Sequence, residues 1–159
     1  MIENLQSFTE SLPPLLQWVG VMVAGAIPFV ESYAGSALGV LAGLNPAVAV
    51  AAAVVGNLVT MVIFVVATAR VRTAAVSRRE KPDSPRRAKL RERFDRFGVP
   101  GVSLLGQTVL PSQITAAAMV SFGASRNAVI GWQIVSIILW GVLFGVLAVI
   151  GSDVAGYGV

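Results

Sequence analysis

The chain has 159 residues, of which 55% are hydrophobic and only 13% are charged, and its mean hydropathy is +0.77. A soluble domain carries about 25% charged residues, so the composition indicates a membrane protein. The chain has no cysteine and no histidine, which excludes disulfides and metal sites with thiolate or imidazole ligands. Proton chemistry within a membrane would therefore fall to a carboxylate.

The N-terminal segment does not resemble a signal peptide, because it carries Glu3 and Glu10 and lacks a basic n-region. We therefore expect the apolar stretch that follows, residues 12–69, to stay in the protein. This stretch contains one charged side chain, that of Glu31. A carboxylate at membrane depth costs about 2.5 to 3.5 kcal/mol on insertion scales, so it is usually kept for a function. Glu31 is the first candidate for a proton-binding or substrate-binding residue.

Residues 12–43 are predicted to form a re-entrant hairpin with its break at Pro28. As a helix, residues 31–43 would span only about 20 Å, which is too short for a hydrocarbon core of about 30 Å. Two tilted spans, residues 12–29 and 32–45, remain an alternative that would put Glu31 in a cytoplasmic turn. Three glycines recur every four residues and predict a smooth stripe for helix packing, with a substrate surface as the alternative: Gly35, Gly39 and Gly43.

Residues 46–69 carry no charge and predict a transmembrane helix of about 36 Å. Asn57 lies inside this helix, directly after Gly56. A buried amide needs a hydrogen-bond partner, which Glu31 or an opened hairpin backbone could supply. A purely structural hydrogen bond and a substrate contact are both open for Asn57.

The linker of residues 70–97 holds eleven of the twelve lysine and arginine residues and four acids. Between two apolar segments, the positive-inside rule explains this run better than nucleic-acid binding and places the linker in the cytoplasm. Residues 84–97 predict an amphipathic helix, with Ser84 as its N-cap and Gly98 past its end. Its basic face would anchor it to lipid headgroups, or serve a regulatory or substrate-gathering role, through Arg86, Arg87, Lys89, Arg91, Arg93 and Arg96.

The second half repeats this plan. Residues 99–123 predict a hairpin broken at Pro111, and residues 127–151 predict a second transmembrane helix. Within that helix, Gly141 and Gly145 repeat the small-residue spacing and could pack a neighbouring helix or a dimer partner. The hairpin also has an uncharged polar cluster that either lines a cavity or is hydrogen-bonded internally, formed by Gln107, Thr108, Ser112, Gln113 and Thr115.

The two halves correspond at an offset of 80 to 83 residues. An accidental likeness between two apolar segments remains an alternative. With a cytoplasmic linker the halves have opposite orientation, which would bring Glu31 and Gln113 together near the midplane. The predicted fold class is an all-α integral membrane protein, a single domain of residues 1–159. It is an inverted repeat of two re-entrant hairpins, each followed by a transmembrane helix, plus a cytoplasmic amphipathic helix.

Several short motifs resemble the small multidrug export protein family over about residues 20–151. They are Gly25-Ala26-Ile27-Pro28 with Glu31, then Gly56-Asn57, then the basic linker, then Arg96-Phe97-Gly98 leading to Leu110-Pro111. That family is similar to the DedA-like (VTT superfamily) membrane proteins. The resemblance implies two inverted re-entrant hairpins, each followed by a transmembrane helix. Through the DedA-like relatives it suggests proton-linked lipid-phosphate translocation or drug tolerance.

The leading hypothesis is a small transporter with proton-coupled efflux of a cationic or amphipathic substrate, in which Glu31 titrates. A lipid or lipid-phosphate flippase or scramblase is the second hypothesis, and a structural membrane subunit is the third. The chain has no catalytic signature, so we expect no enzyme, no cofactor and no metal. The expected location is the plasma membrane, multi-pass, with both termini outside. The expected partners are lipid, a small-molecule or lipid substrate, the proton and further copies of the chain, without nucleic acid.

Overall fold

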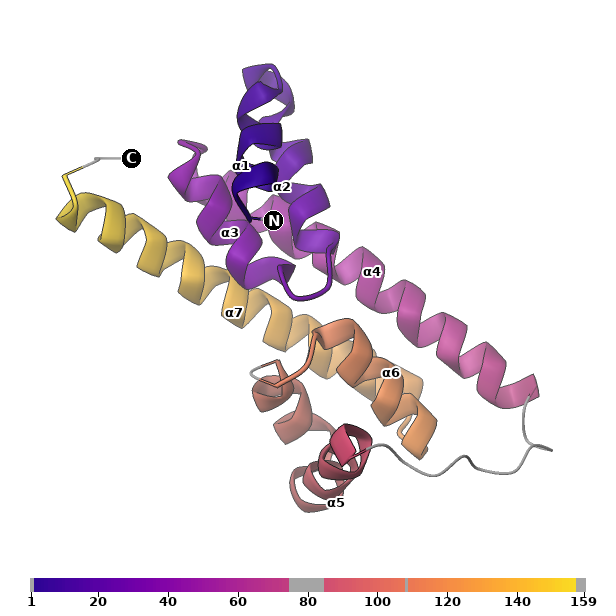
Figure 1. The fold of residues 1–159 in the computed structure, drawn as a ribbon. Coiled ribbons are helices and arrows are strands. Elements are labelled where there is room, and N and C mark those ends of the chain that lie inside the picture. Colours follow the sequence, from indigo (N-terminus) through magenta and orange to yellow (C-terminus); the bar gives the residue numbers. More distant parts are fainter. Residues whose placement is uncertain (1, 75–84, 108, 157–159) are drawn as a thin grey trace. The chain divides into compact units, whose positions relative to one another are not determined.

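The computed structural model describes residues 2–74, 85–107 and 109–156, and over these ranges it contains helices and no strand (Figure 1). The all-helical expectation is therefore confirmed for the described part of the chain. The elements in chain order are α1 (Ile2–Ser11), the 3-10 turn η1 (Pro14–Leu16), α2 (Gln17–Ala26), α3 (Glu31–Leu41), α4 (Pro46–Ala74), α5 (Pro85–Gly106), α6 (Ser112–Phe122) and α7 (Arg126–Val154).

The chain divides into two compact units. The first unit comprises Met1–Thr60 and Ile137–Val159, and the second comprises Met61–Ser136. The two long helices, α4 and α7, each contribute residues to both units. The shorter helices α1, α2 and α3 belong to the first unit, whereas α5 and α6 belong to the second.

Two of the described helices are long and apolar enough to cross a membrane. They cover Pro46–Val71 and Arg126–Val154, with mean hydropathies of 2.5 and 2.7. A helix of 26 residues is about 39 Å long, which exceeds a hydrocarbon core of about 30 Å. Both helices lie where the sequence predicted them: α4 begins at the predicted Pro46 and continues past residue 69 to Ala74, and α7 runs slightly beyond residues 127–151 at both ends.

The start of α4 has a local cause. The side-chain oxygen of Asn45 accepts hydrogen bonds from the backbone N–H groups of Ala47, at 3.0 Å, and Val48, at 3.4 Å. These are donors that the first turn of a helix otherwise leaves without a partner. Pro46 occupies the first helical position, where its missing N–H costs nothing. The Asn-Pro pair therefore fixes where the first long helix begins.

The helices that precede α4 and α7 end in the same way. α3 and α6 are 11 residues each, and each is followed by a glycine in the left-handed region, Gly43 at φ +83 and Gly123 at φ +111. At both ends the residue after the glycine donates its N–H back five residues: Leu44 to Gly39 and Ala124 to Met119. This is the Schellman arrangement, which favours glycine because a side chain is disfavoured at positive φ. A helix of 29 residues follows in each case.

In the first unit, α1, α2 and α3 lie side by side (Figure 1). The core here joins Val21 of α2, Leu38 of α3 and the neighbouring Ala52 and Ala53 of α4. Leu5 packs against this core, which explains why Ile2–Ser11 is helical although the sequence analysis assigned no element there. The burial of one apolar face stabilises a helix that is too short to persist alone.

In the second unit, α5 packs against α6. The path of α5 breaks at Gly98, which has φ +65 and ψ −170. Its first segment thus ends where the sequence analysis ended the amphipathic helix. The second segment runs to Gly106, where an added β-carbon would lie 2.8 Å from the side chain of Thr115 on α6. The rings of Phe94 and Phe122, with centroids 6.1 Å apart, join the first segment of α5 to the end of α6.

Candidate functional site

The connection between α2 and α3 holds Glu31 in an unusual backbone conformation. Pro28 has no N–H group and disfavours helical geometry at the residue before it, so α2 stops and Ile27 is extended at φ −80 and ψ 126. The N–H groups of Val30 and Glu31 then both donate to the carbonyl oxygen of Ile27, at 3.1 and 3.0 Å. This closes a tight turn at which α3 begins.

Two residues of this turn lie in the left-handed region although neither is glycine: Phe29 at φ +73 and Glu31 at φ +56. The left-handed conformation costs a residue with a β-carbon about 1–2 kcal/mol. Such strain persists only where the surrounding structure enforces it, and it occurs preferentially at functional sites. The turn therefore holds the one carboxylate of the apolar stretch at a defined place, at a cost in stability.

The side chain of Glu31 is fully buried, with 0% exposure, and so are those of Ser32 and Ser36 on the same helix. Ser32 donates a hydrogen bond of 2.8 Å to the carbonyl oxygen of Ile137 on α7. This bond crosses 105 positions of sequence and attaches the start of α3 to α7 within the first unit. The residue next to the carboxylate is thus held from outside its own helix.

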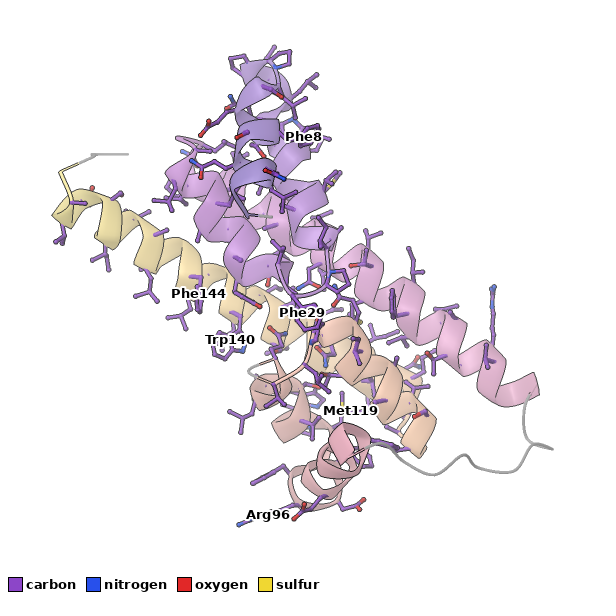
Figure 2. The ribbon with its side chains drawn as sticks, viewed as in Figure 1. Phe8, Phe29, Arg96, Met119, Trp140 and Phe144 are labelled. Carbon is purple, nitrogen blue, oxygen red and sulfur yellow. The ribbon has the colours of Figure 1, made fainter. Side chains whose placement is uncertain are left out.

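Aromatic side chains flank the same turn. The Tyr33 hydroxyl donates to the carbonyl oxygen of Phe29 at 2.9 Å, which supports the strained conformation from within α3. The Tyr33 ring lies 5.4 Å from the Phe144 ring of α7, and Trp140 lies 6.0 Å from Phe144. Figure 2 labels Phe29 at the turn, and Trp140 and Phe144 along α7. These rings shield the turn on the side of α7.

The predicted packing glycines lie at helix contacts in the first unit, with one exception. A β-carbon added at Gly35 would lie 3.1 Å from the Ala53 side chain, and one added at Gly39 would lie 2.7 Å from the Ala49 side chain, both on α4. Gly43 departs from the prediction, because α3 ends at Leu41 and nothing lies within 4 Å of the position of a β-carbon at Gly43. Its role is the left-handed turn after α3.

The glycines of α7 are used within the chain. A β-carbon added at Gly141 would lie 2.9 Å from Val54 of α4 and 3.3 Å from Ser32 of α3. One added at Gly145 would meet Val50 of α4. Both glycines therefore let α7 approach α3 and α4 closely in the first unit. The predicted alternative was a contact with a dimer partner, but this face of α7 is already in contact with helices of the same chain.

Asn57 is fully buried on α4, in the same unit as Glu31. Its burial agrees with the requirement for an internal hydrogen bond. The prediction that its partner is Glu31 or the hairpin backbone stays a prediction.

The polar cluster predicted around Pro111 lies in the second unit. The side chains of Gln107, Ser112, Gln113 and Thr115 are all buried there, whereas Thr108 lies outside the described residues. Thr115 donates to the carbonyl oxygen of Leu110 at 3.3 Å, a local bond across the break before α6. Glu31 belongs to the first unit and Gln113 to the second, so the prediction that the two approach each other also stays a prediction.

Three buried polar residues of the second unit were not singled out from the sequence: Ser103, Gln133 and Ser136. Gln107 donates to the Ser136 hydroxyl at 3.1 Å, and Ser136 donates to the carbonyl oxygen of Ser103 at 2.7 Å. A usable signal was present, because Gln133 is an amide inside an apolar segment, where a polar side chain usually faces the protein interior.

The basic helix is described only in part. Arg96 is exposed on α5 (Figure 2), and its guanidinium carbon lies 5.1 Å from the centre of the Phe97 ring. Ser84 lies outside the described residues. The same holds for the side chains of Arg86, Arg87, Lys89, Arg91 and Arg93.

No group of three or more histidine, cysteine, aspartate or glutamate residues that could hold a metal ion occurs in the described part of the chain. Comparisons with family models, with curated proteins and with solved structures find no match. The resemblance to the small multidrug export protein family therefore stays a prediction from the motifs.

Proposed function

We propose that the chain is a small multi-pass membrane transporter that couples proton movement to efflux of a cationic or amphipathic substrate. The observation that carries the proposal is Glu31, a fully buried carboxylate held by a strained left-handed turn in an otherwise apolar stretch. A carboxylate in such a place is costly to keep, and its usual roles are proton or ion transfer.

The lengths of the helices support a membrane fold with re-entrant hairpins. Helices α2 and α3 have 10 and 11 residues and are therefore about 15 Å long, half of a hydrocarbon core of about 30 Å. Embedded in a bilayer, such a pair would enter and return on the same side. A broken backbone at membrane depth is tolerated where it is covered by protein, and the turn is buried at Val30 and Glu31, although Phe29 is exposed.

The matching ends of the two halves support an inverted repeat. α3 and α6 have equal lengths, end at left-handed glycines 80 positions apart, Gly43 and Gly123, and precede long helices of equal length. Equal lengths with equivalent terminal hydrogen bonds go beyond the shared composition of two apolar segments. With a cytoplasmic linker between them, two equivalent halves must cross the membrane in opposite directions.

The coupling follows from the chemistry of one carboxylate. Desolvation favours the protonated, neutral form of a buried acid, and a bound cation favours the ionised form. Proton and cation therefore compete for Glu31. If the carboxylate faces the two sides of the membrane in turn, each exchange of a cation for a proton moves the two in opposite directions. No further ionisable group in the membrane is required.

The test is transport by the Glu31→Gln variant in proteoliposomes. Glutamine keeps the shape of the side chain but cannot release a proton, so uptake of the fluorescent cation ethidium driven by a pH gradient should fall to the level of empty liposomes. Asp153→Asn is the matched control, because Asp153 is an exposed carboxylate on α7 whose loss should leave uptake unchanged. Glu31→Gln should fold, since an amide is easier to bury than a carboxylate, and Asp153→Asn should fold because the position is exposed.

Wild-type uptake by Glu31→Gln would refute the proposal. A labelled phospholipid measures the competing function: headgroup exchange that requires the protein but no pH gradient would identify a flippase or scramblase instead. Copurification of a second protein in constant ratio, without transport of either probe, would identify a structural subunit.

A further inference from the structure

A second group of buried polar side chains lies wholly within the second unit. Ser103 lies on α5 and Gln107, four positions on, lies in the turn directly after the last residue of that helix, Gly106, while Gln133 and Ser136 are three residues apart on α7. Side chains at these spacings share one face of a helix. The hydrogen bonds from Gln107 to the Ser136 hydroxyl, and from that hydroxyl to the Ser103 carbonyl, bring the two faces together. We call these four residues the amide–hydroxyl cluster.

The cluster has more hydrogen-bonding capacity than the described residues use. The Ser103 hydroxyl, the Gln107 side-chain oxygen and both polar atoms of the Gln133 amide find no hydrogen-bond partner in the described part of the chain. Three of the four side chains are 0% exposed and Gln107 is 9% exposed, so bulk water does not satisfy these atoms. Buried polar groups are almost always paired, and each exception calls for an explanation.

The chemistry of the unused atoms selects the kind of ligand. The cluster offers donor and acceptor atoms side by side, and none of its four residues carries a charge. An ion buried among them would lose its hydration without gaining a counter-charge, which is strongly unfavourable. A neutral group that both donates and accepts hydrogen bonds, such as an amine on an aromatic ring, a hydroxyl or an amide, satisfies the free atoms at no such cost.

We propose that the amide–hydroxyl cluster is a binding site for a neutral hydrogen-bonding group of the transported molecule. This inference rests on the proposed transport function but concerns a different set of residues from Glu31. The transported molecule need not occupy Glu31 and the cluster at the same time. Glu31 would recognise its charge, and the cluster would recognise its neutral polar group.

Two lipophilic cations separate these contributions. Ethidium carries two aromatic amino groups, whereas tetraphenylphosphonium carries no hydrogen-bonding group. Binding of each is measured by equilibrium dialysis with the full chain in detergent. The variants are Gln133→Leu and the smaller change Ser103→Ala. Asn127→Leu is the control, because Asn127 is an exposed amide on the same helix as Gln133.

We expect Gln133→Leu to weaken ethidium binding about tenfold, the loss typical of a buried hydrogen bond to a ligand. Ser103→Ala should weaken it by a smaller factor. Neither variant should change tetraphenylphosphonium binding, and the control Asn127→Leu should leave the binding of both cations unchanged. The thermal midpoint of Gln133→Leu should stay level or rise, because the substitution removes buried polar atoms that the free protein leaves without partners.

If Gln133→Leu weakened the binding of ethidium and tetraphenylphosphonium equally and also lowered the thermal midpoint, the inference would be overturned and Gln133 would be a structural residue. Unchanged ethidium binding in both cluster variants would overturn it as well. These failures leave the role of Glu31 intact, because Glu31→Gln should weaken both cations alike. Wild-type transport by Glu31→Gln would count against the transport proposal itself.

Discussion

Gly56→Ala perturbs the closest approach between helices in the first unit. Gly56 lies inside α4, opposite the end of α2. A β-carbon added there would lie 2.9 Å from the carbonyl carbon of Met22 and 3.1 Å from the backbone nitrogen of Ala26, and it would overlap the carbonyl oxygen of Met22. The atoms in the way belong to the backbone, so no side-chain rotation can make room, and the two helices must separate.

Two opposing terms set the size of the effect. Replacing glycine by alanine inside a helix normally stabilises it by about 0.5–1 kcal/mol. Forcing a methyl group into a packed interface costs typically about 1–3 kcal/mol, and contact with backbone atoms, which cannot rotate away, puts this site at the upper end. The difference is a destabilisation of about 2 kcal/mol, which corresponds to a fall of about 4–8 °C in the unfolding midpoint of a chain of this length.

Thermal unfolding in detergent, followed through the fluorescence of the three tryptophans, measures this shift. Gly131→Ala is the matched control, because Gly131 lies inside α7 and nothing lies within 4 Å of an added β-carbon. The control should raise the midpoint by a few degrees at most, since it gains about 0.5–1 kcal/mol of helix propensity. A Gly56→Ala protein as stable as wild type, or shifted in the same direction as Gly131→Ala, would refute the close approach of α2 and α4.

Two further substitutions test the turn and its attachment. Phe29→Gly should raise the midpoint, because it relieves a left-handed residue worth about 1–2 kcal/mol and loses little packing from a side chain that is 62% exposed. Phe64→Gly, at a half-exposed position inside α4, is the control and should lower the unfolding midpoint. If Phe29→Gly lowered the midpoint as much as Phe64→Gly, Phe29 would not be strained. Ser32→Ala should cost about 1 kcal/mol through loss of the bond to Ile137. Ser152→Ala, which removes only a hydrogen bond to Val149 on its own helix, should lower the midpoint less. Equal shifts in the two variants would show that the Ser32 bond to α7 stabilises the fold no more than a bond within one helix.

Much of the helical framework follows from local rules. The two long helices follow from uncharged apolar runs, the start of α4 follows from Asn45-Pro46, and the end of α6 follows from Gly123. These features depend on residues a few positions apart, so they are readable in the sequence. The candidate Glu31 was readable for the same reason, because one charge in an apolar run is visible without any fold.

Other features of the site required the tertiary structure. Phe29 and Glu31 have no intrinsic preference for positive φ, so their strained turn exists only because Pro28, Tyr33 and the Ser32 bond to α7 hold it. The difference between Gly39 and Gly43, which the four-residue spacing treats as equivalent, depended on where α3 ends.

The sequence by itself determined that the chain is helical, that two of its helices are long and apolar, and that Glu31 is isolated among apolar residues. Only the tertiary structure decided that Gly56 of α4 meets the backbone of α2, that Ser32 bonds to Ile137, and that Gln107 bonds to Ser136. Helix formation depends on hydrogen bonds between residues four positions apart, whereas these contacts join residues 29 or more positions apart. The chain has many similar apolar helix faces, and tertiary packing decides which of them contact each other. A local sequence pattern does not predict this choice.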